Sequence, residues 1–415
     1  MKLSLVRSIG AIAGAMWLMS GSVSAQQAPS QEEMWEILQQ QKAEIEGLKE
    51  RLDEANEKIS DNDEKVSITA DAVENISSNA FAGASGNSST TLGGYAELHY
   101  NKLDNDLSGG EDKDEIDFHR FVLFLGHEFS DSVRMFSELE VEHSIAGEGQ
   151  NGEIELEQAY IEWDINKDLS AKAGLFLIPV GILNETHEPN TFYGVERNSV
   201  EKNIIPTTWW EAGGAVSGEI APGLSFDFAL HSGLFMENGS VRSGRQKVSE
   251  AKADDFAATG RIRYTGIAGL ELSATLQQQT DVLQGENIGG ASDVSALLAE
   301  VHAIYETGPF SIRALYAMWD IDDDIEMLTV GADKQKGWYV EPSFDVNDKI
   351  GLFVRVSQWD TQAGASNDSE YDQIDFGINY MLTEGVVLKA DYQRQKAPTG
   401  SNEFDGFNFG IGWAF

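Results

Sequence analysis

Residues 406–415 read GFNFGIGWAF, a stretch in which a large apolar side chain takes every second position. The large residues are Phe407, Phe409, Ile411, Trp413 and Phe415, and the residues between them are Asn408, Gly410, Gly412 and Ala414. Successive side chains of a β-strand point to opposite faces. The stretch therefore predicts a strand with one continuous apolar face and one small or polar face.

The same alternation continues upstream, in runs of roughly 9 to 14 residues that follow one another from Leu92 onward. This is the length that a tilted strand needs to cross a bilayer. Seven connections between runs are tight and eight are long and polar, which gives sixteen runs. Short turns on one side and long loops on the other predict an all-β fold, a sixteen-stranded antiparallel transmembrane β-barrel over residues 92–415. A soluble all-β repeat protein has no reason to sort its connections this way.

Charged residues share one parity in most runs, and apolar residues share the other. With lipid outside the barrel, the charged parity faces the lumen. Candidate lumen charges on this wall are Arg134, Glu138, Glu140, Glu142, Arg261, Arg263, Arg313 and Arg355. Residues 118–129 are apolar on both parities, so the facing of this run stays open.

Tryptophans near the ends of the runs are expected in the aromatic girdles that such barrels place at the two membrane interfaces. They are Trp163, Trp209, Trp210, Trp319 and Trp359. Residues 406–415 are also similar to the closing strand of a bacterial outer-membrane barrel, whose terminal aromatic forms part of the signal for assembly. That strand is expected to pair with the run that begins near Leu92.

The N-terminal quarter has a different composition. Lys2, Arg7, an apolar run over residues 9–19 and small residues up to Ala25 predict a secretory signal peptide at residues 1–25. Residues 26–79 carry aliphatic side chains seven positions apart, which predicts a periplasmic coiled coil, with a single amphipathic helix packed on a globular core as the alternative. Small and polar residues predict a flexible linker at 80–91.

The chain has 29 Lys and Arg residues against 69 Asp and Glu residues, a formal net charge of −40. This balance argues against a nucleic-acid partner. It suits a surface that meets cations, including those that bridge lipopolysaccharide. The expected location is the bacterial outer membrane, with the N-terminal region in the periplasm. The coiled coil is expected to reach periplasmic or cell-wall partners, and a mainly tethering role is one alternative.

The third long connection, residues 179–208, is rich in aromatic and aliphatic residues and is expected to pack against something. A loop of this length is usually functional. Gly174-x-Phe176-x-x-Pro179-x-Gly181 before it, Glu196-Arg197 within it, and Pro206 followed by Gly213-Gly214 after it resemble the phosphate-selective porin O and P family, which are sixteen-stranded trimeric porins.

This resemblance implies that the third loop folds into the lumen of a homotrimeric porin and narrows it. The implied candidates for the constriction are Glu185, His187, Glu188, Glu196 and Arg197. The dense basic set of that family is missing, because the loop has Arg197 and Lys202 against four glutamates. We therefore expect weak selectivity or cation preference. An anion (phosphate)-specific channel is the alternative, which arginines converging in space would support.

Metal and enzyme motifs are weak or absent. Asp104, Asp106, Ser108 and Glu115 have the spacing of an EF-hand calcium loop, but no helices flank them, so an ordinary acidic loop is the alternative. No Gly-x-Ser-x-Gly, His-Glu-x-x-His or phosphate-binding glycine loop occurs. The sequence predicts passive diffusion of small hydrophilic solutes or ions, without a cofactor. A barrel-based enzyme or adhesin is the second alternative.

Overall fold

The computed structural model describes residues 35, 39, 42, 49, 90–147 and 149–415. The predicted signal peptide, residues 80–89 of the predicted linker and nearly all of the predicted coiled coil lie outside the described residues. These three segments therefore stay predictions. Within the described residues, no helix has the length and hydropathy that a bilayer crossing requires.

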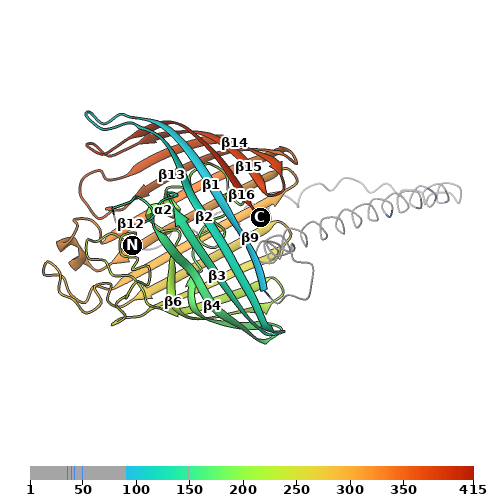
Figure 1. The fold of residues 1–415 in the computed structure, drawn as a ribbon, viewed down its shortest axis with the longest axis horizontal. Coiled ribbons are helices and arrows are strands. Elements are labelled where there is room, and N and C mark those ends of the chain that lie inside the picture. Colours follow the sequence, from blue (N-terminus) through green and yellow to red (C-terminus); the bar gives the residue numbers. More distant parts are fainter. Residues whose placement is uncertain (1–34, 36–38, 40–41, 43–48, 50–89, 148) are drawn as a thin grey trace, which may run out of the picture. The chain divides into compact units, whose positions relative to one another are not determined.

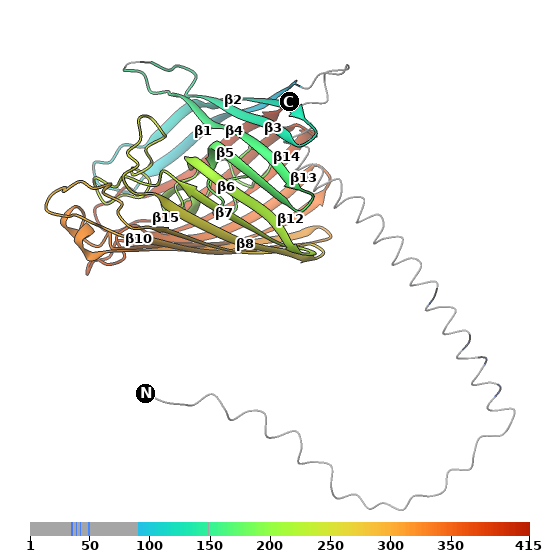
Figure 2. The ribbon, with the colours of Figure 1, turned by 90° about the horizontal axis from the view of Figure 1, so that it is seen from below.

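Sixteen antiparallel strands close into one barrel in the described part of the chain, as the alternation predicts (Figures 1 and 2). Each strand pairs with its neighbours in sequence, and β1 pairs with β16. The strands are β1 (Thr90–Asn105), β2 (Lys113–Ser130), β3 (Val133–Glu142), β4 (Ile154–Asn166), β5 (Leu169–Leu177), β6 (Trp210–Ala221), β7 (Leu224–His231), β8 (Ala257–Ile267), β9 (Leu270–Gln279), β10 (Ala296–Thr307), β11 (Phe310–Ile321), β12 (Lys334–Asn347), β13 (Ile350–Asp360), β14 (Tyr371–Thr383), β15 (Val386–Lys396) and β16 (Phe404–Ala414). The short helical segments α2 (Val200–Asn203) and η1 (Asp323–Met327) lie in loops of the barrel.

Residues 406–415, with their alternating large apolar side chains, close the barrel. β16 pairs with β1 from Tyr95↔Ala414 to Asn105↔Phe404. Phe415 extends this ladder, since its N–H donates to the Gly94 carbonyl at 2.9 Å and its carbonyl accepts from the Gly94 N–H at 3.0 Å. Closure leaves no unpaired strand edge in lipid, where an unsatisfied backbone group costs several kcal/mol.

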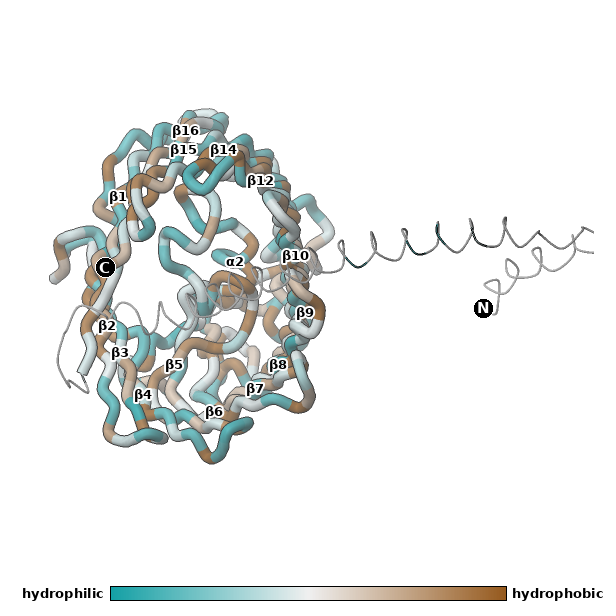
Figure 3. The backbone as a smooth tube through the Cα atoms, turned by 90° about the vertical axis from the view of Figure 1, so that its right-hand side faces the viewer, coloured by the Kyte–Doolittle hydropathy of each residue, from teal (hydrophilic) through white to brown (hydrophobic). Residues whose placement is uncertain are grey.

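Alternate residues face lipid and lumen, as the parity of the charges predicts. Asp375 and Phe376 are neighbours in β14, yet their exposed fractions are 2% and 51%. The tube in Figure 3, seen along the barrel, alternates between hydrophilic and hydrophobic colours around the ring of strands. The apolar parity therefore meets the membrane, and the charged parity lines the interior.

The girdle prediction is wrong for most of the tryptophans. Trp163 is 52% exposed, but Trp209, Trp210, Trp319 and Trp359 are buried. Trp209 lies in the third long loop, and Trp319 and Trp359 pack in the same buried cluster as that loop. A position near the end of a run does not reveal whether the indole points outward to the interface or inward to a loop.

A β-bulge resolves the ambiguous run in β2. Glu97 pairs with Arg120 and His99 pairs with Asp117, so β2 carries one more residue than β1 in this interval. The extra residue changes which parity faces inward. Beyond it, Val122 and Phe124 point inward and pack with Tyr95 in a second buried cluster. The apolar character of both parities thus reflects an apolar patch on the lumen wall.

Candidate pore constriction

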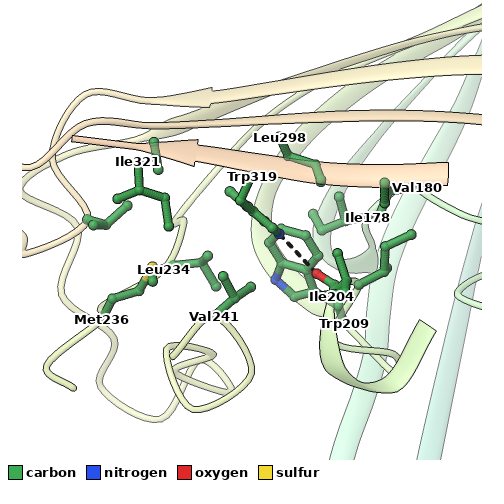
Figure 4. Close-up of a cluster of buried hydrophobic side chains, with 14 of the residues drawn as sticks. Ile178, Val180, Ile204, Trp209, Leu234, Met236, Val241, Leu298, Trp319 and Ile321 are labelled. Atoms are coloured by element: carbon green, nitrogen blue, oxygen red, sulfur yellow. Dashed lines mark hydrogen bonds between the residues drawn. The ribbon is translucent and has the colours of Figure 1, made fainter. Parts of the chain in front are cut away.

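The third long loop, residues 178–209 between β5 and β6, lies inside the barrel, where α2 appears within the ring of strands (Figure 3). Its apolar side chains pack against the inner wall (Figure 4). The indole N–H of Trp319 in β11 donates to the carbonyl of Ile204 at 2.9 Å. The unusual apolar composition of this loop follows from its place against the wall.

The carboxylate of Glu201 holds the loop in shape. One oxygen accepts from the backbone N–H groups of Ile182 at 2.6 Å and Leu183 at 2.7 Å. The other accepts from the Asn198 amide at 3.0 Å and from the Tyr339 hydroxyl of β12 at 2.8 Å. Four donors satisfy this buried carboxylate, as burial requires. Sequence reasoning counted Glu201 only as a loop charge.

The tip of the loop contacts the wall at β15. The ammonium of Lys389 donates to the carbonyls of Phe192 at 3.0 Å and Gly194 at 2.9 Å. The carboxylate of Asp391 accepts from the backbone N–H of Val195 at 2.6 Å. The loop therefore crosses the lumen from the β5–β6 wall to β15, and the expectation that it narrows a pore stays a prediction.

Three of the five predicted constriction residues face the wall and attach the loop to it. Glu185 pairs with Arg261 of β8. His187 lies 3.3 Å from a Glu138 oxygen of β3 and 3.6 Å from a Glu157 oxygen of β4.

Glu196 makes the third wall contact. The two remaining candidates, Glu188 and Arg197, form hydrogen bonds within the loop. Glu196 lies 3.1 Å from His99 of β1 and also accepts from the Asn101 amide at 3.0 Å. The backbone carbonyl of Glu188 accepts from the Thr191 N–H at 3.0 Å. Arg197 donates to the Thr208 hydroxyl at 2.7 Å.

Four of the eight predicted lumen charges pair with residues of neighbouring strands. Arg355 lies between Glu341 at 3.0 Å and Asp375 at 3.1 Å. The remaining pairs join neighbouring strands: Arg134 with Glu162 and Asp164, Arg261 with Asp227, and Glu140 with Arg120. Paired charges contribute little net field to the lumen. These residues mainly satisfy one another across the inner surface.

The other candidates have different surroundings. Glu138 accepts from the Gln158 amide at 2.7 Å in addition to contacting His187. Arg263 lies in β8, opposite Ser225 and Ser273 of the flanking strands. Of the weak calcium candidates, Asp104, Asp106 and Ser108 are exposed, while Glu115 pairs with Lys113 at 2.9 Å.

Two polar cavities lie beside the third loop. The outer cavity, about 340 Å³, is bounded by strand ends that lead into long loops, and Glu142 and Arg197 are among its lining residues. The inner cavity, about 550 Å³, is bounded by the short turns around residues 307–310 and 347–350, and its lining includes Arg313. Phe192, near the loop tip, lines both cavities. The loop thus partitions the lumen.

The fourth long loop, residues 232–256 between β7 and β8, also folds inward, which sequence reasoning missed. Its residues Leu234, Met236 and Val241 join the buried cluster of the third loop (Figure 4). Arg242 donates to the Lys202 carbonyl at 2.9 Å, and Arg245 donates to the Pro206 carbonyl at 3.0 Å. Three cations among the six residues 242–247 were the available signal.

Four cations converge on the outer cavity: Arg197, Lys202, Arg242 and Arg245. Within the described residues, none of the four has a carboxylate oxygen within 4.0 Å. Burial and the neighbouring charges of Arg245 and Arg197 lower the pKa of Arg242 to about 10. Burial is the larger cause of this shift and the charges of Arg245 and Arg197 add to it, so an anion beside them would offset part of their mutual repulsion.

The Gram-negative porin family model matches residues 226–400. An uncharacterized protein of Aquifex aeolicus (strain VF5) is 30% identical over 358 residues, which cover 78% of this chain and 80% of the relative. The finer resemblance to the phosphate-selective porin O and P family stays a prediction.

Solved structures share the fold. An anion-selective porin from Comamonas acidovorans superposes with a TM-score of 0.58 at 15% identity, covering 79% of this chain and all of that one. The trimer form of OmpT, an in-vitro folded outer membrane protein of Vibrio cholerae, gives a TM-score of 0.52 at 12% identity, covering 79% and 99%. At these identities the likeness shows the barrel architecture alone.

We predict that the attachment of the third loop through His187 weakens at alkaline pH. Burial opposes its charge, but the Glu138 carboxylate and hydrogen bonds to Glu138 and Glu157 raise the pKa of His187 to about 10. Because the folded pKa lies above the ordinary value, this stabilisation is complete below about pH 6.5 and is lost as the pH rises through about 10. The urea midpoint of the wild type should exceed that of His187→Asn at pH 6, and the gap should shrink by pH 10.

His127→Asn is the matched control for this measurement, because His127 lies in β2 and contacts Thr90, away from the loop. The difference between the urea midpoints of His127→Asn and the wild type should be the same at pH 6 and pH 10. A gap for His187→Asn that stays constant from pH 6 to pH 10 would contradict the prediction.

Proposed function

We propose that this chain, which belongs to one family with the Aquifex aeolicus protein and matches the Gram-negative porin model over residues 226–400, lets small hydrophilic solutes or ions diffuse passively across the bacterial outer membrane. One observation carries the proposal: a loop held by wall contacts crosses a closed barrel between two polar cavities. Family and fold favour a channel over an enzyme.

The mechanism combines size exclusion with electrostatic bias. Solutes pass the tip of the third loop, where Phe192 borders both cavities. Charges that line a narrow, water-filled passage then decide which ions pass. Both effects depend on the loop, because it sets the open area and carries Arg197 and Lys202.

The convergence of cations favours the anion alternative over the cation preference expected from sequence. Several charges of the outer cavity cancel in pairs, namely Lys113 with Glu115, Arg120 with Glu97 and Lys247 with Glu155. Of the remaining lining residues, the carboxylates of Asp117, Glu142 and Glu196 stand against four cations, Arg197, Lys202, Arg242 and Arg245, and two of these carboxylates contact histidines. Local charge matters more than the net charge of −40, since exposed charges beyond about 10 Å are screened. We therefore propose weak anion preference.

We further propose that the chain assembles as a homotrimer. In this proposal the periplasmic coiled coil at residues 26–79 contacts periplasmic or cell-wall partners, and lipopolysaccharide contacts the acidic outer loops. Support comes from the heptad spacing in the sequence and from the trimer form of a protein with this fold. Native mass spectrometry of the detergent-purified protein should give three chains per particle. Deletion of residues 26–79 should lower the temperature at which the trimer dissociates. A monomer as the dominant species of the intact, folded chain would contradict the proposal.

We predict that deletion of residues 190–195 raises single-channel conductance by about twofold, because the loop tip no longer narrows the passage. The contacts of His187 and Glu196 with the wall remain in this variant. Planar-bilayer recordings in 1 M KCl measure the effect. Deletion of residues 398–401, in the last long connection, is the control and should leave conductance unchanged. Equal conductance of the wild type and the 190–195 deletion, both folded, would argue against a constriction at the tip.

We predict that the Arg242→Ala/Arg245→Ala double variant lowers the anion-to-cation permeability ratio by about twofold or more, because two unpaired charges leave the outer cavity. Reversal potentials under a tenfold KCl gradient give this ratio. Arg394→Ala is the matched control, since the side chain of Arg394 is 75% exposed. Cation preference of the wild type, or an unchanged ratio in the double variant, would rule out this source of selectivity.

A further inference from the structure

Three histidines and an aspartate line the outer cavity, as do the arginines of the fourth loop. His99, Asp117, His119 and His143 come from three adjacent strands or their ends. We propose that Asp117, His119 and His143 bind one divalent transition-metal ion of the zinc class. This site goes beyond solute diffusion and does not depend on it.

Two local irregularities bring these residues together. The β-bulge in β2 opposes His99 with Asp117 and inserts an extra residue between Asp117 and Arg120, which lets His119 face the same cavity. β3 ends at Glu142, and His143 then adopts a left-handed backbone with φ of 52°. Its N–H donates to the His119 carbonyl at 3.2 Å. Bulges frequently re-aim side chains next to functional sites.

The donor atoms are already close. Nδ1 of His119 lies 3.1 Å from Asp117 Oδ2, and Nδ1 of His143 lies 2.9 Å from the same oxygen. Potential ligand atoms of all three residues lie within 4.8 Å of one another. In a tetrahedral zinc site with bonds of about 2.0–2.2 Å, ligand atoms are roughly 3.4 Å apart. Small side-chain rotations therefore suffice to enclose an ion, and a fourth position stays open to the cavity.

A second group of residues supports the first. The ring of His99 stacks on that of His119, with centroids 4.6 Å apart. His99, His119 and Glu196 also have potential ligand atoms within 4.8 Å of one another. Nδ1 of His99 lies 3.1 Å from Oε1 of Glu196. Glu196 thus supplies a second carboxylate charge beside the triad, from the third loop.

The donor set selects the class of ion. Imidazole nitrogens suit zinc, copper and nickel, whereas calcium and magnesium prefer oxygen ligands alone. The nearest cations of the strands are already paired, Lys113 with Glu115 at 2.9 Å and Arg120 with Glu97 at 2.6 Å. The carboxylates of Asp117 and Glu196 therefore supply negative charge at the triad and at the neighbouring His99.

Two other clusters of the described residues lack these properties. Glu138, Glu157 and His187 have side chains no more than 3% exposed, and they attach the third loop to the wall. Glu142, Glu153 and Glu155 offer carboxylates only, and the ammonium of Lys247 contacts two of them. The histidine triad combines nitrogen donors with access from a cavity.

Isothermal titration of the full-length, EDTA-treated protein in detergent with ZnCl₂ at pH 7.5 tests the proposal. Absorption of bound Co²⁺ in the visible range reports the coordination. All seven histidines lie between residues 99 and 302, so nitrogen ligation can come only from the barrel. We expect one ion per chain, and affinity at least about tenfold weaker in His119→Ala and in His143→Ala. His127→Ala, outside the cluster, should bind like the wild type.

Cold and heated electrophoretic mobility confirms that each variant forms a barrel. Absence of binding to the folded wild type overturns the proposal, and so does undiminished binding in both histidine variants. Conductance in KCl with EDTA is measured on the same preparation. A folded protein that binds zinc but conducts nothing overturns the proposed channel and leaves the metal site standing. A folded protein that conducts but binds no zinc overturns the metal site and leaves the proposed channel standing.

Discussion

The constraint on which the whole structure depends is that lipid offers no hydrogen bonds to the backbone. Every N–H and C=O of the sixteen strands must find its partner within the sheet, so the sheet closes through β1 and β16. Closure divides each strand into a lipid-facing and a lumen-facing parity. Loops that are apolar in composition then have one place to bury their side chains, which is the inner wall.

The sequence is informative where the signal is local. Alternation along β14, where Asp375 and Phe376 face opposite sides, can be read from neighbouring residues alone. The number of strands follows from the same kind of evidence, and the composition of residues 179–208 indicates that this loop packs against something. Its path into the lumen is implied only by the resemblance to a porin family. The predicted coiled coil at residues 26–79 rests on a comparable local signal and stays a prediction.

The sequence is uninformative where the outcome depends on register or on contacts across the lumen. Trp319 looks like an interfacial residue until the third loop is seen to pack against it. Glu185 and Glu196 look like free constriction charges, yet each has a partner on a different strand of the wall. Arg242 and Arg245 stand in what reads as an ordinary outer loop. A count of the charged residues on the lumen-facing parity includes charges that ion pairs cancel. The sequence therefore predicts weak selectivity or cation preference, whereas the unpaired cations lead us to propose weak anion preference.

The bulge between Asp117 and Arg120 requires one more residue in β2 than in the facing stretch of β1. A deletion of one residue in an outer loop shortens that loop and leaves the sheet intact. The same deletion at this bulge would restore regular pairing and turn one end of the strand inside out, with its charges in lipid or its apolar residues in water. Related sequences should therefore vary in residue type here far more readily than in residue number.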